Sequence, residues 1–159
     1  DGVRIGAACV GRVCDLGITD MNNMGAAMAP AAADTLTRFF ADTGTGPADY
    51  AMIVTGDLGQ VGSTLLRQLM EHSGTPLGDN YTDCGLLLFD RARQDVHAGG
   101  SGCGCSASVL CAHFLPLLES GKLRDLLFCP TGALMSPTSS QQGESIPGIC
   151  HTVLLHAAG

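Results

Sequence analysis

Aromatic side chains are scarce in this sequence, and tryptophan is absent. Phe, Tyr and Trp together make up 4% of the 159 residues, although apolar residues account for 45%. A core without many large rings must be built from Ala, Val, Leu, Ile and Met, which suits a tightly layered α/β domain. The length is that of one ordinary domain with its own core, so we expect a single domain over residues 1–159.

Positive charge is scarce as well. Eight Lys and Arg residues stand against fifteen Asp and Glu residues, which gives a net charge of −7. The basic residues form no cluster along the sequence. Nucleic-acid binding depends on basic patches that neutralise phosphates, so we expect no nucleic-acid partner. For the same reason an anionic membrane surface is a poor partner for the chain by itself.

Long apolar runs and a disulfide pattern are also missing. No apolar run approaches the roughly 20 residues that a membrane span needs, so we expect no transmembrane segment. The eight cysteines are fewer than a disulfide scaffold of this length would carry. Several lie in apolar contexts, such as Cys9, Cys111 and Cys129. We interpret them as small core residues in a reducing compartment.

Strand and helix patterns alternate along the chain, which is typical of an α/β domain around one sheet. The expected strands cover residues 4–13, 50–54, 86–89, 126–129 and 150–155, with a short extended piece at 95–98. The expected helices cover residues 24–42, 63–72 and 106–120. A polar loop of unusual length, residues 131–148, lies between the last two strands, and long ordered loops are often functional.

The first expected helix has a proline near its start. Its pattern is clear once past Pro30, a residue that is tolerated at a helix start. Leu36, Phe39 and Phe40 should face the core.

The third expected helix, residues 106–120, is apolar nearly all round. Such a helix is expected to be buried on every side. Pro116 should kink its last turn, and Gly121 is well placed to end it.

A glycine-rich segment, residues 99–107, reads GGSGCGCSA and leads into that helix. Its Cys-x-Cys spacing lacks a second pair, so it is a weak pattern for a metal site. A redox pair would need a stabilised thiolate, and no Lys or Arg lies nearby in the sequence. Glycines before a helix leave backbone N–H groups free to bind a phosphate or carboxylate, or they allow close backbone packing. Both of these interpretations stay open.

Single polar residues near the ends of expected strands are further candidates. Asp57 follows the strand 50–54 and suits an acid/base or ligand role, although a helix-entry cap is the favoured interpretation. His151 comes after the long loop, and a lone histidine there is more often structural than functional. Arg4 and Arg12 are the basic residues nearest the first strand, and we favour a salt-bridge role for them.

Three segments of the chain resemble the thiolase family. GSGCGCSASVL is similar to the thiolase loop that leads into a central helix, with Ser101 at the position of a catalytic histidine. IVTGDLGQVGS places Gly56 at the catalytic histidine or asparagine position of related enzymes. In TGALMSP, Ser136 or Met135 occupies the site of the second thiolase cysteine.

This resemblance implies an α/β, thiolase-like fold. The chain would be one half, the C-terminal half, of the duplicated fold, with a mixed sheet and helices on both faces. The N-terminal half, which carries the nucleophilic cysteine in thiolases, would then be absent from residues 1–159. In that fold the helix after the glycine loop lies between the two halves, so its exposed apolar face would favour a homodimer.

Longer stretches resemble a narrower family, the thiolase-like stage V sporulation proteins of spore-forming Firmicutes. They are RIGAACVGRVCDLGITDMNNMGAAMAPAAADT, VTGDLGQVGS, GGSGCGCSA and TGALMSPTSSQQGESIPGICH. The resemblance implies a non-catalytic protein that binds dipicolinic acid, free or as its calcium chelate, and assists its uptake into the developing spore. It also implies membrane proteins of the same sporulation operon as partners, a peripheral location at the forespore or spore inner membrane, and no cofactor.

The expected ligand-binding residues combine this resemblance with the chemistry of the glycine loop. Dipicolinate is a flat dianion that needs hydrogen-bond donors, and we expect Ser101, Gly102, Cys103, Asp57 and His151 to contact it. We expect no metal ligand and no catalytic residue, because glycine and serine at the thiolase positions are poor bases at neutral pH. Two alternatives stay open: an acyltransferase that uses Asp57 or His151 as an unusual base, and a structural scaffold for membrane partners.

Overall fold

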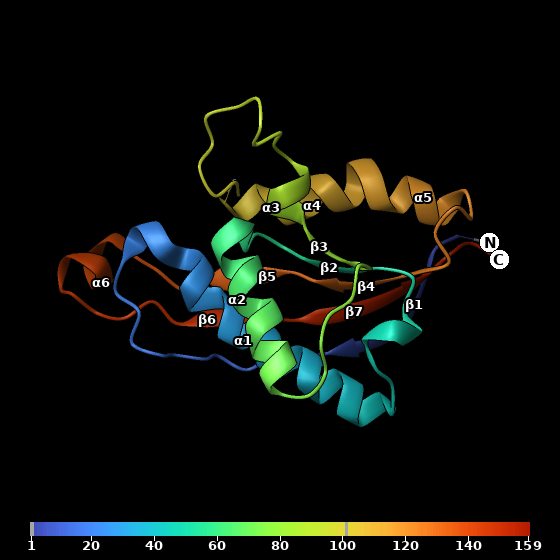
Figure 1. Ribbon diagram of the computed structural model, residues 1–159, viewed down its shortest axis with the longest axis horizontal. Coiled ribbons are helices and arrows are strands. Elements are labelled where there is room, and N and C mark those ends of the chain that lie inside the picture. Colours follow the sequence, from blue (N-terminus) through green and yellow to red (C-terminus); the bar gives the residue numbers. More distant parts are fainter. Residues whose placement is uncertain (1, 101) are drawn as a thin grey trace.

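A five-stranded mixed sheet forms the centre of the protein, which we describe from a computed structural model over residues 2–100 and 102–159. The strands are ordered β1-β7-β4-β2-β3 (Figure 1). Their bounds are β1 Arg4–Cys9, β2 Ile53–Thr55, β3 Tyr81–Asp83, β4 Asp125–Cys129 and β7 Thr152–His156. β2 is parallel to β3 and β4, whereas β7 is antiparallel to both β1 and β4.

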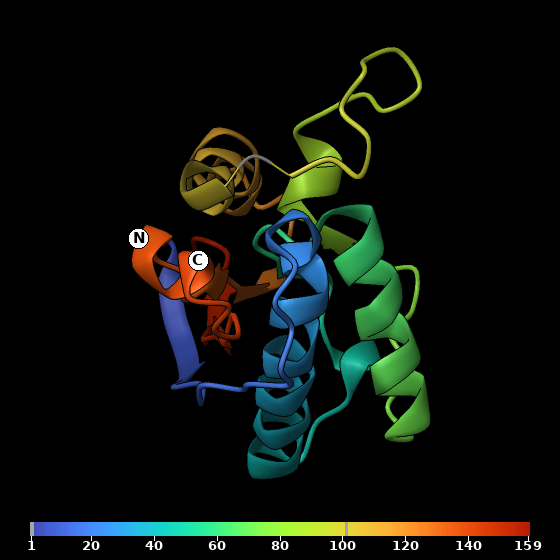
Figure 2. The same ribbon diagram turned by 90° about the vertical axis from the view of Figure 1, so that its left-hand side faces the viewer.

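Helices cover both faces of this sheet (Figures 1 and 2). On one face lie α1 (Met24–Thr43) and α2 (Gly59–His72). On the other lies a continuous helical run of three pieces: α4 (Cys105–Val109), the π-helical turn η4 (Leu110–Phe114) and α5 (Leu115–Glu119). The expectation of an α/β fold with a mixed sheet and helices on both faces is therefore confirmed.

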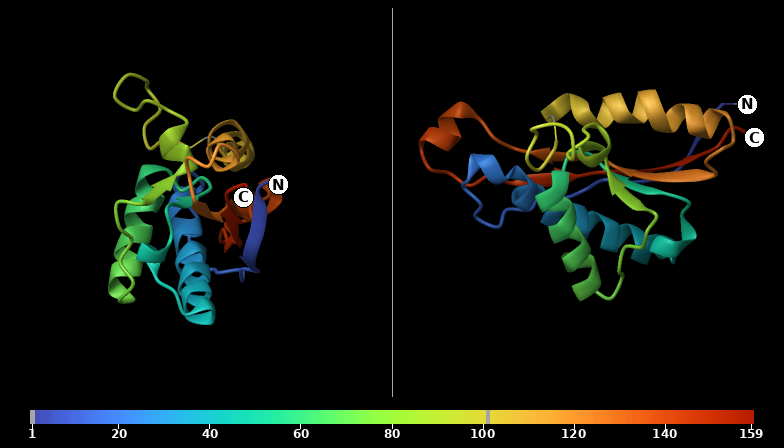
Figure 3. Two further views of the ribbon diagram at one scale, coloured as in Figure 1. Left: turned by 90° about the vertical axis from the view of Figure 1, so that its right-hand side faces the viewer. Right: turned by 45° about the horizontal axis from the view of Figure 1, so that its top comes forward.

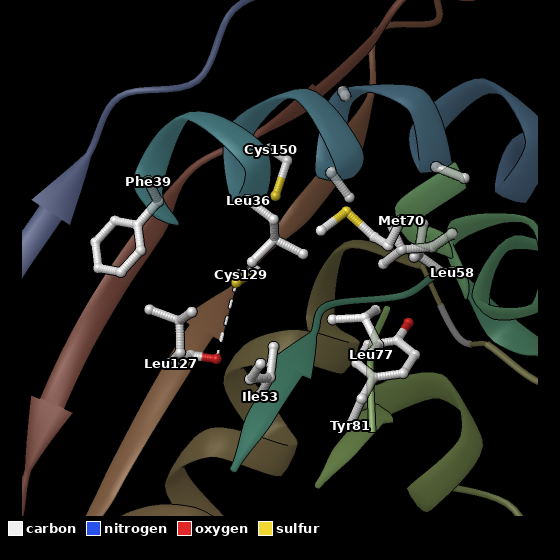
Figure 4. Close-up of a cluster of buried hydrophobic side chains, with 14 of the residues drawn as sticks. Leu36, Phe39, Ile53, Leu58, Met70, Leu77, Tyr81, Leu127, Cys129 and Cys150 are labelled. Atoms are coloured by element: carbon white, nitrogen blue, oxygen red, sulfur yellow. Dashed lines mark hydrogen bonds between the residues drawn. The ribbon is translucent and has the colours of Figure 1, made fainter. Parts of the chain in front are cut away.

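The larger of two apolar cores lies between the sheet and the α1–α2 layer. Leu36, Ile53 and Met70 are fully buried and lie close together there (Figure 4). Burying a side chain of this size stabilises the fold by roughly 1.5–3 kcal/mol. The two helices approach closely at Gly25 and Gly62, because a Cβ atom added at Gly25 would lie 2.7 Å from the Leu58 carbonyl oxygen.

α1 begins at Met24, well before Pro30, which lies inside the helix. The expected range of residues 24–42 is confirmed, whereas the expectation of Pro30 at a helix start is wrong; Leu36, Phe39 and Phe40 are buried as expected. An interior proline removes one helical hydrogen bond. That cost is offset because the residues around Pro30 are buried in the core, namely Ala27, Met28, Ala29, Ala31 and Ala32.

The second core lies under the α4–α5 run. Val109, Phe114 and Leu118 are buried against Leu126 and Phe128 of β4. The outward side of the same run is exposed, including Ala107, Cys111 and Ala112. The expectation of burial on every side is therefore wrong for this chain, since one sheet covers only one side of the run.

Pro116 acts earlier in this helix than expected. The Leu115 N–H bonds to the Leu110 carbonyl, a five-residue spacing that defines the π turn. Proline has no N–H to continue the α-helical ladder, and a π turn inserts one residue at such a site. Gly121 ends the run with a positive φ of 69°, as expected.

One stretch of the described residues, Gly102–Glu119, is long and apolar enough to cross a membrane by length and composition alone. The core helix of a globular protein passes the same test. Here the stretch packs its buried side chains on the sheet.

Three segments differ from the sequence expectations. Residues 86–89 do not form a strand: α3 (Cys84–Leu87) ends within them, and β3 precedes α3. Residues 95–98 carry no strand and belong to a projecting loop (Figure 2). The segment 131–148 is not simply a loop, because it contains β5 (Thr131–Ala133) and α6 (Pro137–Gln141) and reaches β6 (Gly148–Cys150), which pairs with β5.

Candidate functional site

A cavity of about 330 Å³ lies beyond the carboxyl end of β2. Three segments line it: residues between 22 and 28 at the start of α1, residues between 57 and 61 at the start of α2, and residues 98–100 and 102 of the glycine loop. Ligands in α/β proteins commonly bind beyond the carboxyl ends of parallel strands. This cavity is therefore the candidate site.

Asp83 fixes the turn that forms one wall of the cavity. Its buried carboxylate accepts hydrogen bonds from the backbone N–H groups of Leu58 (2.9 Å), Gly59 (3.0 Å) and Gly85 (2.9 Å). The Thr55 hydroxyl donates a fourth, at 2.7 Å. Burial raises the pKa of this carboxyl, although the four hydrogen bonds act in the opposite direction.

The glycine loop is held against this turn by backbone hydrogen bonds. The Gln60 N–H bonds to the Ala98 carbonyl at 2.7 Å, and the Gly100 N–H to the Gly85 carbonyl at 3.2 Å. A Cβ atom added at Gly85 would lie 2.9 Å from the Gly100 Cα atom. Close backbone packing therefore accounts for glycine at these positions, and the Gly100 N–H is already engaged.

Two of the expected ligand-binding residues, Asp57 and Gly102, line this cavity. The Asp57 N–H donates to the Thr131 hydroxyl at 3.1 Å, which links the turn to β5. Cys103 is exposed in the short turn η3 (Gly102–Gly104) and is not among the residues that line the cavity. Ser101 lies outside the described residues.

His151 lies apart from the cavity lining, in the connection between β6 and β7. It is exposed, and its Nδ1 atom accepts a hydrogen bond from the Gly11 N–H at 3.0 Å. A Cβ atom at Gly11 would lie 1.6 Å from the Cys150 carbonyl oxygen. The ring therefore fastens the segment after β1 to the segment after β6.

Gly56, at the thiolase base position, has no room for a side chain. A Cβ atom there would lie 2.3 Å from the Ser106 Oγ atom and 2.7 Å from the Thr131 backbone nitrogen. Ser136, which with Met135 is one of the two residues expected at the position of the second thiolase cysteine, caps α6 by accepting the Ser139 N–H at 3.1 Å. Both positions serve local structure.

Metal and thiol chemistry receive little support from the geometry. Within residues 2–100 and 102–159, no group of three or more His, Cys, Asp or Glu side chains is placed to hold a metal ion. All eight cysteines are free. Burial and the neighbouring Asp83 raise the pKa of the Cys84 thiol, so its reactive thiolate form is disfavoured.

Asp83 is the main feature that sequence reasoning missed. It is the last residue of β3 and the N-cap of α3, where its side chain accepts the Gly85 N–H. An Asp two residues before a glycine at a strand end is a usable signal for such a cap. Arg12, by contrast, pairs with Asp34 as the favoured salt-bridge interpretation predicts. The same interpretation is not confirmed for Arg4, which makes no ion pair among residues 2–100 and 102–159.

Comparison with known proteins places this sequence in a family. The sequence pattern of the stage V sporulation protein AD family matches residues 1–156. The stage V sporulation protein AD of Bacillus subtilis (strain 168) is 48% identical over 157 residues, which is 99% of this chain and 46% of that protein. The chain thus spans about half the length of the curated relative that it matches.

Proposed function

The chain belongs to the stage V sporulation protein AD family, and from that premise we propose that it is part of a non-catalytic protein that binds dipicolinic acid and assists its uptake into the developing spore. A role in sporulation follows from the family itself. The ligand, the absence of catalysis and the whole protein's partners are the proposal. The observation that carries it is the cavity beside Asp57, with no room for a catalytic side chain at Gly56.

The state of the thiolase positions supports the absence of catalysis. Acyl transfer needs a base and a group that stabilises an oxyanion. Gly56 supplies no side chain, and Ser136 is engaged in capping α6. Neither position therefore offers a free catalytic side chain.

The cavity favours the calcium chelate over the free dianion. Its volume of about 330 Å³ lies at the small end of ligand pockets. A bare dianion would be repelled by the Asp57 carboxylate in the lining, whereas the chelate is neutral and calcium prefers carboxylate oxygens as ligands. Backbone N–H groups at Gly102 and beyond, at the start of the helical run, suit the ligand's carboxylates.

Calorimetric titration tests this proposal directly. Dipicolinate is titrated with and without calcium into this chain and into the full-length protein. We expect calcium to strengthen binding, and Asp57→Asn to weaken binding of the chelate by about tenfold. Asp95→Asn is the matched control, because Asp95 is 95% exposed on the projecting loop. Equal affinities for Asp57→Asn and the control would refute a role for Asp57.

Comparing the two proteins locates the essential contacts. If both proteins bind dipicolinate, the essential contacts lie in this chain. If only the full-length protein binds it, residues outside this chain are required for binding. Binding by neither would refute the ligand proposal and favour the scaffold. Turnover of acyl-coenzyme A by the full-length protein would refute the absence of catalysis.

We further propose that membrane proteins of the same sporulation operon are partners and that the protein is peripheral at the forespore or spore inner membrane. The exposed apolar side of the α4–α5 run supports a contact with another protein surface, because Cys111 and Ala112 face outward there. Co-purification with these membrane proteins from sporulating cells tests the partnership, and its absence would count against it.

A further inference from the structure

A second groove lies at the opposite end of the sheet from the cavity, where the start of β1 and the end of β7 lie side by side (Figures 1 and 3). It has a volume of about 560 Å³ and is lined by Arg4, Ile5, Gly6, Arg124, His156 and Ala157. Three of these six residues carry basic side chains. The chain as a whole has only eight Lys and Arg residues and a net charge of −7, so this concentration of basic groups is created by folding.

Strand register brings the basic residues together. Arg4 of β1 lies opposite His156 of β7, which in turn lies opposite Asp125 of β4. Directly opposed residues of antiparallel strands project from the same face with their Cβ atoms roughly 4.5–5.5 Å apart. Arg4 and His156 therefore share one face at the end of the sheet.

Gly6 makes room for the His156 ring. A Cβ atom at Gly6 would lie 2.3 Å from the His156 Nε2 atom. The register between β1 and β7 shifts between Ile5 and Ala7, which marks a β-bulge at this glycine. Bulges commonly re-aim side chains near binding sites. Among the described residues the His156 ring has no hydrogen-bond partner of its own.

Arg124 is held in place beside this pair. Its guanidinium donates to the Asp125 carboxylate and, at 2.7 Å, to the Asp49 carbonyl. The other Asp125 oxygen accepts the Ala51 N–H at 2.7 Å. These contacts orient the Arg124 guanidinium and leave its Nη1 group without a partner within the described ranges.

Of the two arginines that line the groove, Arg4 is the one whose charge no carboxylate of the described residues neutralises. Asp125 neutralises Arg124, and the Arg4 guanidinium has no side-chain partner among residues 2–100 and 102–159. Guanidinium groups pair with oxyanions through parallel N–H donors. Two guanidinium groups and an imidazole that meet in one groove offer donors to several oxygens of one ligand group.

We propose that this groove binds a phosphate group. The phosphate comes either from a small soluble molecule or from a lipid headgroup, and both sources present the same oxygens. The groove shares no lining residue with the cavity beside Asp57, so this proposal does not rest on dipicolinate binding.

The first experiment is a titration of the isotope-labelled chain with inorganic phosphate, followed by NMR and compared with chloride at equal ionic strength. Amide shifts should map to residues 4–6, 124 and 156–157. Arg4→Gln should weaken the apparent affinity by about fivefold. Arg93→Gln is the control of equal charge change, since Arg93 is 86% exposed on the projecting loop. Equal weakening by both variants would show a diffuse charge effect and overturn the proposal.

Vesicles distinguish the source of the phosphate. Co-sedimentation is measured with vesicles of phosphatidylglycerol and phosphatidylcholine, and with phosphatidylcholine alone. Binding that requires phosphatidylglycerol and is lost in Arg4→Gln identifies a lipid headgroup. Binding of inorganic phosphate without vesicle binding identifies a soluble phosphate compound. Absence of both overturns the proposal.

Discussion

Asp83 is the residue on which the candidate site depends most, although it does not line the cavity. Its carboxylate satisfies the N–H groups of Leu58, Gly59 and Gly85 at once. Asp83→Asn turns one acceptor oxygen into a donor facing such N–H groups. Because buried unsatisfied polar groups are costly, we expect a loss of about 1–3 kcal/mol in the free energy of unfolding, measured by urea denaturation. Asp95→Asn should leave it unchanged.

The same carboxyl gives a pH prediction with a defined sign. Burial raises its pKa in the folded state above the ordinary value of 3.8. The folded state thus holds this proton more tightly than the unfolded state, so the contribution to stability is complete below the unfolded pKa and is lost as pH rises through the folded pKa. The stability difference between the wild type and Asp83→Asn should therefore shrink as pH rises above about 4. A growing difference would contradict this pKa direction.

Gly56 provides a second test at the scale of one residue. Gly56→Ala places a methyl group against the Ser106 Oγ atom and the Thr131 backbone. Because backbone cannot move aside cheaply, we expect a loss of about 1–3 kcal/mol in unfolding free energy. Gly104→Ala is the matched control, because Gly104 has a φ of −86° and open space around its Cα atom. Equal stability of the two variants would show that the turn tolerates a side chain.

At the scale of elements, apolar patterns predicted some elements correctly and misassigned others. The helix expected at 24–42 corresponds to α1, and the strand expected at 126–129 lies within β4. The apolar run at 86–89 was ambiguous, because four apolar residues fit a strand or a helical turn equally well. The Asp83 side chain stabilises the helical turn, because it accepts the Gly85 N–H as the N-cap of α3.

The segment 131–148 escaped prediction for a different reason. Its residues are mainly polar and carry no periodic apolar pattern. β5 and β6 form because they pair with each other and pack against α1: a Cβ atom at Gly148 would lie 2.3 Å from the Ala27 carbonyl oxygen. Such a long-range contact leaves no local signal in the sequence.

The candidate site was predictable only in part. Asp57 and Gly102 both line the cavity. They could be predicted because each lies next to a local signal in the sequence, a strand end for Asp57 and a glycine-rich turn for Gly102. His151 lies apart from that lining because its ring fastens Gly11, a partner far away in the sequence. The ligand-binding roles of these residues stay predictions.

Arg67 on α2 ties that helix to the start of β3. Its guanidinium donates to the carbonyls of Leu77 (2.9 Å), Gly78 (3.2 Å) and Tyr81 (3.0 Å), and lies 4.8 Å from the Tyr81 ring centre. We expect Arg67→Ala to lower the free energy of unfolding by about 2 kcal/mol. Arg67→Lys should recover only part of this loss, since an ammonium group lacks the guanidinium fork.

Hydrogen exchange, with a surface variant as control, tests whether the Arg67 hydrogen bonds hold the loop before β3 in place. Amides near residues 77–81 should exchange faster in Arg67→Ala, because the loop before β3 loses its attachment to α2. Arg91→Ala, on the exposed projecting loop, should change neither the free energy of unfolding nor the exchange of the amides near residues 77–81. Unchanged exchange in Arg67→Ala would show that the loop is held by its other contacts.

At the scale of the whole molecule, the alternation of strand and helix patterns was enough to predict the fold class. It was not enough to predict what covers the α4–α5 run. An apolar helix indicates burial, but only the assembled sheet shows how much burial one layer provides. The thiolase-like assignment and the C-terminal position in a duplicated fold stay predictions from the resemblance.

The exposed side of this run leads to a last prediction, self-association of the chain. Leu88 is 41% exposed beside a groove of about 320 Å³ between α3 and η4. Covering such apolar surface favours association, so we expect dimers at about 0.1 mM by sedimentation velocity. Leu88→Lys should weaken the dimer by about tenfold, while Leu69→Lys, at a leucine 39% exposed on α2, should not. A monomer at all concentrations, or equal effects of both variants, would exclude this face as the dimer contact.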